Sequence, residues 1–215
     1  MPEEYVKVDD LRIRYWSNDV ARAKDSSKPA VVLFHGNAFS LDNWKETKTL
    51  DALTSAEFPV YAIDLPAGNG SKSDKVDESK FRTYKDLVPI IENIFSKLGI
   101  GFRDLVIVGP SLGGGFAVSY ALAHQKRVMA LVLIAPALHR LDQKEQDELS
   151  NLEMPILLVW GDKDTLIPIE EFGRPLKNQL SHSKLLIIKD AGHAAYLEKP
   201  SEFNEILTDF LTEIS

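Results

Sequence analysis

Six short apolar runs, separated by stretches with helical spacing, constrain the fold of this chain more than any other feature of its sequence. The runs are at residues 30–34, 60–63, 105–108, 130–135, 156–160 and 185–188. Most are apolar at consecutive positions, which is typical of strands buried on both faces of a sheet. Helical spacing occupies about residues 42–56, 79–98, 112–124, 169–180 and 199–213. This alternation predicts an α/β fold with a mostly parallel central sheet and helices on both faces.

The segment before the first of these runs has a different pattern. Residues 5–16 alternate around Asp9 and Asp10, which predicts an N-terminal antiparallel hairpin with one covered face. Residues 18–29 are polar and are expected to form a loop. The chain has 215 residues, enough for one sizeable core, and contains no internal repeat or linker. We therefore expect a single domain over residues 1–215.

Composition excludes several classes of function. The net charge of −7 argues against a nucleic-acid-binding protein, which needs a basic face. The chain has no cysteine, which excludes disulfides, thiolate catalysis and cysteine-bound metals. No cluster of His, Asp or Glu has the spacing of metal ligands, so we expect neither metal nor cofactor. The charged N-terminus shows no secretory signal, and no apolar run approaches the roughly 18 residues of a membrane span. These features predict an intracellular, cytoplasmic protein that does not bind membranes.

A serine between glycines follows the third apolar run. Residues 109–113 read GPSLG and fit G-x-S-x-G, in which a strained strand-to-helix turn projects the serine oxygen from the sheet edge. Small residues are needed on both sides because the backbone packs closely there. A glycine-rich turn in which Ser111 is only a helix N-cap is the alternative. A phosphate loop is excluded because no Gly-Lys-Ser/Thr ending follows, and a dinucleotide fingerprint is excluded because no strand is followed by G-x-G-x-x-G.

His193 is the histidine that we expect to activate Ser111. A serine hydroxyl is a poor nucleophile until a base takes its proton. His193 follows the last apolar run, and the carboxyl ends of parallel strands meet at one edge of the sheet. Gly192 allows close backbone approach there. We interpret His35, which follows the first run, as structural.

A carboxylate after an earlier strand should hold the imidazole tautomer. The turn after residues 156–160 offers Asp162 and Asp164. We favour Asp164, because it lies further out in the loop and can reach the last loop, whereas Asp162 can bond its own backbone. The chain order serine, aspartate, histidine is the order that this turn type requires.

Two backbone N–H groups should stabilise the oxyanion that forms during acyl transfer. One belongs to Leu112, directly after the serine. The other should come from the loop after residues 30–34, where Gly36 permits a tight turn and Asn37 is our candidate. The alternative is that this loop merely closes a strand.

Residues 31–211 resemble the serine-type α/β-hydrolases, and more closely the small abhydrolase-domain-fourteen subgroup. The motifs that carry the resemblance are HGNAFSLDNW, DLPAGNGSKS, PSLGG and AGHAAYLEKP. The resemblance implies an α/β-hydrolase fold and a serine hydrolase acting on short acyl groups, which in one case are acyl-lysines. The chain departs from the family at Ala67, where glycine is frequent, and at Pro110, which removes a backbone donor.

Most members of the family carry a cap between the strands that here end near residue 135 and begin near residue 156. Only about twenty residues intervene in this chain, enough for one short amphipathic helix and not for a cap domain. We therefore expect an open, shallow site that accepts a small acyl substrate. Its expected substrate-binding walls are Phe39, Leu65, Leu138, Leu166, Ile167 and Tyr196.

These observations predict a carboxylesterase-like serine hydrolase with Ser111, Asp164 and His193 as catalytic residues and Asn37 and Leu112 as oxyanion donors. Two alternatives remain at the level of sequence. One is a cofactor-free perhydrolase or haloperoxidase-like enzyme, in which peroxide replaces water. The other is an interaction protein that keeps the hydrolase fold without turnover. The oligomeric state is left open.

Overall fold

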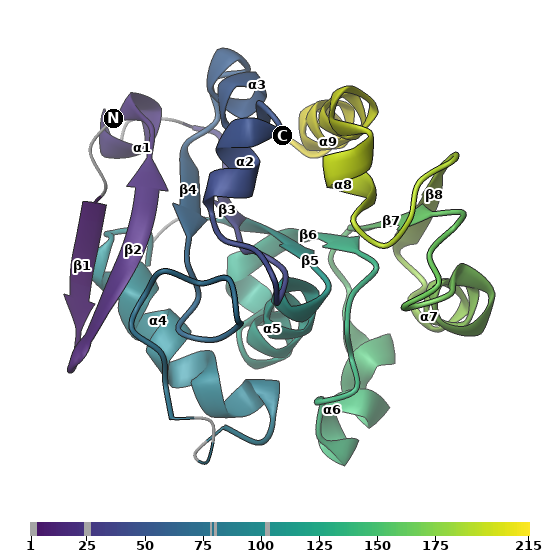
Figure 1. Cartoon of the computed structure of the whole chain (residues 1–215), viewed down its shortest axis with the longest axis horizontal. Helices are drawn as coiled ribbons and strands as arrows, with labels where there is room; N and C mark the ends of the chain where they lie inside the picture. Colours follow the sequence, from purple (N-terminus) through teal and green to yellow (C-terminus); the bar gives the residue numbers. More distant parts are fainter. Residues whose placement is uncertain (1–3, 24–26, 78, 80, 102–103) are drawn as a thin grey trace.

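One mixed sheet organises the computed structural model, which describes residues 4–23, 27–77, 79, 81–101 and 104–215 (Figure 1). Its eight described strands are β1 (Glu4–Val8), β2 (Leu11–Ser17), β3 (Ala30–Leu33), β4 (Val60–Ile63), β5 (Leu105–Pro110), β6 (Val128–Ile134), β7 (Ile156–Gly161) and β8 (Ser183–Ile188). Their order across the sheet is β1-β2-β4-β3-β5-β6-β7-β8. The hairpin β1–β2 is antiparallel and joins β4 antiparallel, whereas all pairs from β4 to β8 are parallel. The predicted sheet and its N-terminal hairpin are confirmed.

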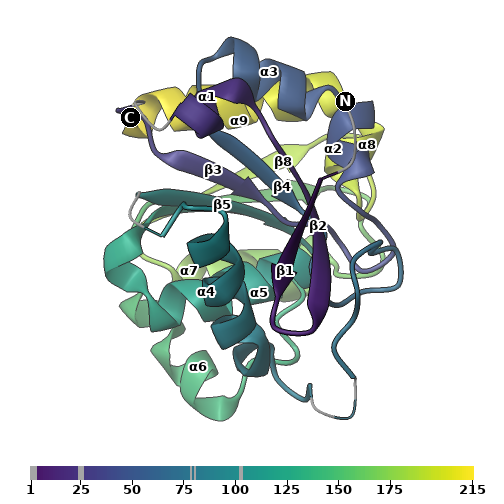
Figure 2. The same cartoon turned by 90° about the vertical axis from the view of Figure 1, so that its left-hand side faces the viewer.

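Helices cover both faces of the sheet (Figure 2). The described α-helices are α1 (Asp19–Ala23), α2 (Asp42–Glu46), α3 (Thr49–Ser55), α4 (Val88–Lys97), α5 (Leu112–Ala123), α6 (Gln143–Glu148), α7 (Arg174–Gln179), α8 (Ala195–Glu198) and α9 (Pro200–Ile214). Short 3₁₀ turns lie at η2 (Tyr84–Leu87), η3 (Gln125–Arg127) and η4 (Leu149–Asn151), and a π-helical turn at η5 (Ile169–Gly173) precedes α7. The helices α2, α3, α8 and α9 lie on one face, and α4 to α7 lie on the other.

Alternate residues of each central strand supply the two halves of the core. In β3, Val31 and Leu33 pack against the face that carries α3 and α9, whereas Val32 packs against the opposite face with α4 and α5. Every residue of β3, β4, β5 and β7 is buried. Burial on both faces explains why these strands are apolar at consecutive positions.

The predicted helix over residues 42–56 is two helices in the structure. Lys48 has a left-handed backbone (φ 61°) that separates α2 from α3. The Thr49 hydroxyl donates a hydrogen bond of 2.7 Å to Asn204 of α9, and the Asn204 side chain donates one of 2.9 Å to the Thr47 carbonyl. The break therefore docks this segment on α9, a contact between residues far apart in the sequence.

Two other boundaries differ from the prediction. The helix expected over residues 79–98 is continuous only from Tyr84, where η2 leads into α4. Residue 79 is an isolated 3₁₀ residue among those described, and residues 78 and 80 lie outside them. The loop expected over residues 18–29 contains the short helix α1, whose first turn is held by a hydrogen bond from the Ala21 N–H to the Asn18 side chain; residues 24–26 are not among those described.

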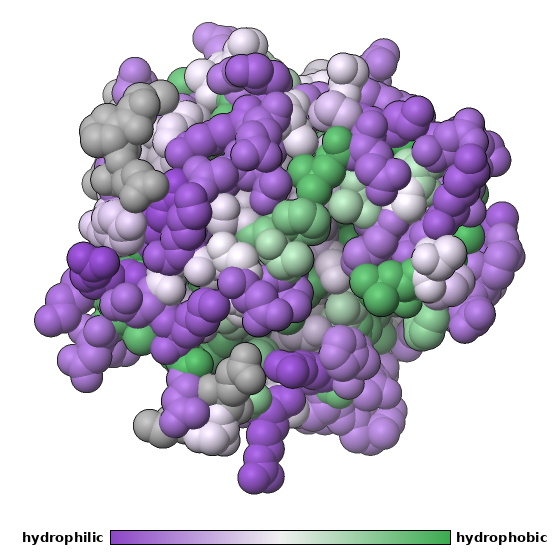
Figure 3. Space-filling model, viewed as in Figure 1, coloured by the Kyte–Doolittle hydropathy of each residue, from purple (hydrophilic) through white to green (hydrophobic). Residues whose placement is uncertain are grey.

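The segment between β6 and β7 forms no cap domain. All of residues 135–155 are described, and they contain only α6 and the turn η4. The loops at the carboxyl ends of β3, β5 and β7 are therefore open on one side. Figure 3 shows a band of apolar and intermediate surface across the middle of the face on which these loops lie in Figure 1.

Candidate active site

Ser111 lies on a sharp turn between β5 and α5. Its backbone angles (φ 48°, ψ −115°) are strained for a residue with a side chain. The turn is possible because a Cβ at Gly109 would collide with the backbone of Gly113, and a Cβ at Gly113 would lie 2.7 Å from the His35 carbonyl oxygen. The carbonyl of Ser111 accepts hydrogen bonds from the N–H groups of Gly114, Gly115 and Ala137, which holds the turn in place.

His193 and Asp164 meet at the same edge of the sheet. The Nδ1 atom of His193 lies 2.8 Å from Oδ2 of Asp164. The other carboxylate oxygen of Asp164 accepts hydrogen bonds of 2.9 Å from the N–H groups of Leu166 and Ile167, and the Asp164 side chain is fully buried. An ionised carboxylate accepts only, so His193 donates from Nδ1 and its Nε2 atom is left as the acceptor.

Asp162, the other candidate in this turn, faces a different partner. Its carboxylate lies 3.5 Å from Lys189. The loop that carries His193 is tied down separately, since the Gly192 N–H donates a hydrogen bond of 2.9 Å to Glu198 of α8. Glu198 thus orients the histidine loop, a role that sequence reasoning did not assign.

The Nε2 atom of His193 is buried and has no hydrogen-bond partner among the residues that the structure describes. Ser111 and His193 line the same cavity of about 150 Å³, together with Gly36, Asn37, Phe39 and Tyr196 among others. A buried nitrogen without a partner costs free energy, so it is expected to serve something other than stability. The Ser111 hydroxyl and Nε2 are therefore not hydrogen-bonded to each other, although both residues line this cavity.

Both expected oxyanion donors border Ser111. Leu112 is the first residue of α5, so its N–H has no acceptor within the helix. Asn37 is exposed in the loop after β3, and within the described residues its N–H has no protein acceptor. The carbonyl of Asn37 accepts a hydrogen bond of 2.9 Å from Gly70, which fixes this loop against the loop after β4.

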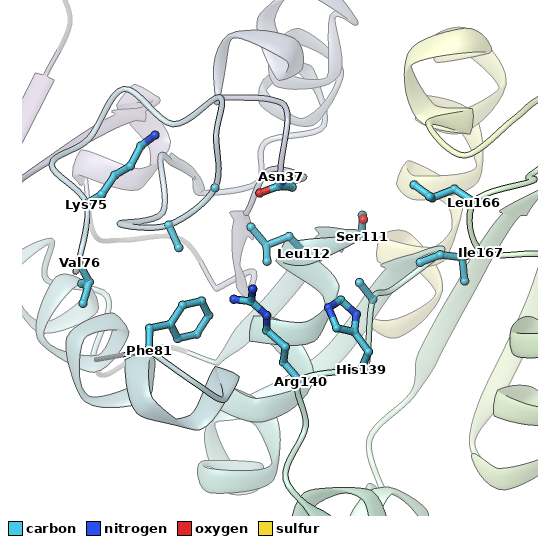
Figure 4. Close-up of a pocket in the computed structure, with 13 residues that line it drawn as sticks. Asn37, Lys75, Val76, Phe81, Ser111, Leu112, His139, Arg140, Leu166 and Ile167 are labelled. Carbon is cyan, nitrogen blue, oxygen red and sulfur yellow. The ribbon is translucent and has the colours of Figure 1, made fainter. Parts of the chain in front are cut away.

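A second, larger cavity of about 380 Å³ also borders Ser111 (Figure 4). Leu166 and Ile167 line it, as expected, and Leu166 also lines the small cavity. Sequence reasoning missed its other walls, which include Ala67, Gly68, Lys75, Val76, Phe81, His139 and Arg140. Most of them lie in irregular segments without periodicity, although His139 and Arg140 do follow the end of β6.

The structure separates two of the expected walls from Ser111. Leu65 is 1% exposed and belongs to the core cluster beneath α5, where its N–H donates to Nε2 of His35. Leu138 lines a third cavity of about 660 Å³ between α6 and α7, which does not contain Ser111. The remaining expected walls, Phe39 and Tyr196, border the small cavity.

Comparisons with known proteins identify the family to which this fold belongs. The α/β-hydrolase fold family model matches residues 29–148 and 137–200. The chain belongs to the α/β-hydrolase fold family. The crystal structure of a predicted CIB-like hydrolase from Thermoplasma acidophilum superposes on this hydrolase with a TM-score of 0.84 and 28% identity, covering 98% of this chain and 97% of that one.

Curated relatives place this α/β-hydrolase nearer to the subgroup that the sequence resembled. Protein ABHD14A of Mus musculus is 30% identical over 94% of this chain and 77% of its own length. "Putative protein-lysine deacylase ABHD14B" of Rattus norvegicus is 30% identical over 86% of this chain and 84% of its own length. The carboxylesterase CesB of Bacillus subtilis, at 21% identity and a TM-score of 0.78 over 98% of this chain and 91% of its own, shares the fold.

None of the described helices is long and apolar enough to cross a membrane. No group of three or more His, Asp or Glu side chains in the described part of the chain could hold a metal ion.

A buried ionic cluster beneath the site fixes two of its loops. Asp64, at the end of β4, accepts hydrogen bonds from the Leu41 N–H (2.5 Å), the Lys72 N–H (3.2 Å) and the Arg14 guanidinium (3.2 Å). Arg14 also binds both carboxylate oxygens of Asp42, at 2.9 and 2.7 Å. The cluster therefore ties the hairpin to the loop that carries Asn37 and to the loop after β4.

We expect Arg14→Met to lower the free energy of unfolding by about 3 kcal/mol, because Asp64 would stay fully buried without the guanidinium, and Asp42 would keep only lysines as its cationic partners. Chemical denaturation measures this loss. Arg12→Met, two positions along the same strand but exposed, is the matched control and should cost under about 0.5 kcal/mol. Equal losses in the two variants would contradict the role of the cluster.

The same cluster predicts how the difference in free energy of unfolding between wild type and Arg14→Met depends on pH. The hydrogen bond from Arg14 holds the pKa of Asp42 well below its usual value. A carboxylate whose pKa is depressed by folding adds stability that is present above its unfolded pKa, about 3.9, and is lost as the pH falls below it. The difference between wild type and Arg14→Met should therefore be constant near neutral pH and shrink below about pH 4.

His35 is structural, in agreement with its interpretation from sequence. It is 1% exposed, with Nδ1 2.8 Å from the Gly36 carbonyl oxygen and Nε2 accepting from the Leu65 N–H at 2.9 Å. Burial lowers the pKa of this imidazole, which keeps it neutral in the tautomer that both contacts require. It joins the loops after β3 and β4.

Proposed function

We propose that this protein is a serine hydrolase that cleaves short-chain acyl esters through an acyl-enzyme intermediate. The observation that carries the proposal is the His193–Asp164 pair, whose buried and unpartnered Nε2 faces the cavity that Ser111 also lines. Few structural roles require a strained serine, a buried carboxylate and an available imidazole nitrogen at one edge of a sheet.

The proposed mechanism begins at Ser111. Its Oγ attacks the acyl carbonyl carbon while Nε2 of His193 takes the hydroxyl proton. Asp164 holds the His193 tautomer and stabilises the imidazolium that forms. The N–H groups of Leu112 and Asn37 stabilise the negative charge on the carbonyl oxygen.

The second half of the cycle returns the enzyme to its starting state. The carbonyl–oxygen bond to the leaving group breaks, and His193 gives its proton to the departing alkoxide. A water molecule then attacks the carbonyl carbon of the Ser111 ester while His193 takes its proton. The bond between Ser111 Oγ and the carbonyl carbon breaks, and His193 returns the proton to Oγ. The products are an alcohol and a short-chain acid.

The open site favours short acyl groups. Since no cap covers the loops, a long alkyl chain would stay largely in water and gain little from burial. The name of the rat relative includes protein-lysine deacylase, so amide-linked acyl-lysine is a second substrate class to test alongside esters.

A panel of 4-nitrophenyl esters from acetate to dodecanoate tests the proposal, with acetyl-lysine and butyryl-lysine peptides in parallel. We expect kcat/KM to be highest for acyl chains of two to about five carbons and to fall by about tenfold or more for long chains, because the added methylenes are not buried. Faster turnover of the longest chains would contradict the open-site argument. The absence of turnover above that of Ser111→Ala, for every ester and peptide, would contradict hydrolysis itself.

A further inference from the structure

The large cavity beside Ser111 is basic in an acidic protein. Its described lining includes Arg140, Lys75 and His139 and no Asp or Glu, whereas the chain as a whole has a net charge of −7. The rest of the lining is mostly apolar, with Val76 and Phe81 among its members. A group of one sign of charge beside apolar walls attracts ligands of the opposite sign.

Arg140 is the best placed of the three basic side chains. Its guanidinium carbon lies 5.0 Å from the centre of the Phe81 ring, which is itself stacked on Phe116 at 5.5 Å. A guanidinium that rests on a fixed aromatic ring loses less freedom when it binds a carboxylate. Within the described residues no carboxylate forms an ion pair with Arg140.

The direction of the side chain agrees with this role. Figure 4 shows Arg140 and His139 extending side by side from the loop after β6 into the space between Phe81 and Ser111. Lys75 lies on the far wall, where its Nζ is 3.4 Å from the Asn69 carbonyl oxygen. In that view the guanidinium of Arg140 lies beside Phe81 and below Leu112, and the His139 ring lies between it and Ser111, so Arg140 is a donor set back from the reacting serine.

The two cavities can be assigned to the two halves of a substrate. His193 must return a proton to the leaving group, and it lines only the small cavity. Leu112, whose N–H holds the carbonyl oxygen, lines only the large cavity. The leaving group then extends past His193, and the acyl chain extends into the large cavity toward Arg140.

We propose that the acyl group removed by this hydrolase ends in a carboxylate, which Arg140 binds. This inference rests on the proposed function and narrows it to half-esters or amides of short dicarboxylic acids. Ser111 Oγ bonds to the carbonyl carbon, the bond to the leaving group breaks, and the distant carboxylate keeps its charge throughout. Water releases the dicarboxylate.

Two 4-nitrophenyl esters of equal length test the proposal: the hydrogen glutarate, with a free carboxylate, and the methyl glutarate, with none. Rates are taken above those of Ser111→Ala, which removes self-hydrolysis of the half-ester. We expect wild type to prefer the hydrogen glutarate by about tenfold in kcat/KM, the size of one partly exposed charge-assisted hydrogen bond. Arg140→Gln should abolish that preference and bring the ratio of the two kcat/KM values close to one.

Two further variants separate this role from a general effect on structure. Arg140→Lys keeps the charge and should retain part of the preference. Arg12→Gln removes a guanidinium that also lies 5.0 Å from an aromatic ring, that of Tyr5 on the hairpin, and should change neither rate. If Arg140→Gln kept the wild-type preference for the hydrogen glutarate, whether or not kcat/KM fell for both esters, the proposal would be overturned.

A second pair of substrates checks on which half the anion lies. In 4-acetoxybenzoate the carboxylate is on the leaving group, and in its methyl ester that charge is absent. If Arg140→Gln abolished a preference for the charged member of this pair and not of the glutarate pair, the assignment of the acyl chain to the cavity that Arg140 lines would be overturned. Efficient hydrolysis of methyl glutarate without any preference for charge would overturn this inference alone, whereas no hydrolysis of any ester would overturn the proposed function.

Discussion

Ser111→Ala is expected to lower kcat for short acyl esters by about 10⁶-fold, to the level of the oxyanion donors and binding alone. The change deletes one oxygen and leaves the backbone of the turn, its glycines and its hydrogen bonds to Gly114, Gly115 and Ala137 in place. Alanine at the same strained φ of 48° should fold as serine does. Steady-state hydrolysis of 4-nitrophenyl acetate measures the loss, and chemical denaturation checks that the fold persists.

Ser181→Ala is the matched control for that variant. Ser181 is exposed in the turn before β8 and lines neither cavity that contains Ser111. The kcat of Ser181→Ala should therefore stay within about twofold of the wild-type value. If Ser111→Ala kept more than about a hundredth of the wild-type rate, the serine could not be the nucleophile.

Asp164→Asn is expected to lower kcat by about 10⁴-fold. Asp164 accepts from the Leu166 and Ile167 N–H groups with one oxygen and from His193 with the other. With the amide oxygen toward those two N–H groups, the asparagine NH₂ faces Nδ1 and favours the tautomer that has its proton on Nε2. Nε2 could then no longer accept the Ser111 proton.

Asp162→Asn, two residues away, separates this effect from a general loss of charge in the turn. Asp162 contacts Lys189 and not His193, so its loss should change kcat by no more than about twofold. Equal losses in the two aspartate variants would contradict the assignment of Asp164.

Local patterns in the sequence predicted the parts of the site that depend on one strand end each. Ser111 and Asp164 follow the buried strands β5 and β7, and His193 follows the partly buried edge strand β8; parallel strands bring such ends to one edge. Gly109 and Gly113 showed that the chain turns sharply at Ser111, because only small residues tolerate the close backbone. The choice of Asp164 over Asp162 followed from reach along the loop.

Contacts between distant segments could not be predicted in the same way. The break at Lys48 depends on Asn204, and the position of Phe81 depends on its stacking with Phe116 of α5. Leu65 was predicted to be a wall, but it packs into the core while residues of the loop beyond it line the cavity. The periodicity of apolar residues predicts helices and strands. It could not predict the cavity of about 380 Å³ beside Ser111, because that cavity is lined mostly by irregular segments.

Labelling with a fluorophosphonate probe, followed by mass spectrometry of the modified peptide, tests the central claim most directly. The probe reacts with serines whose hydroxyl is activated by a base. We predict that wild type is labelled at Ser111, that Ser111→Ala is not labelled, and that His193→Ala is labelled far more slowly. Labelling of wild type no faster than Ser111→Ala, or modification of a different serine, would contradict the account.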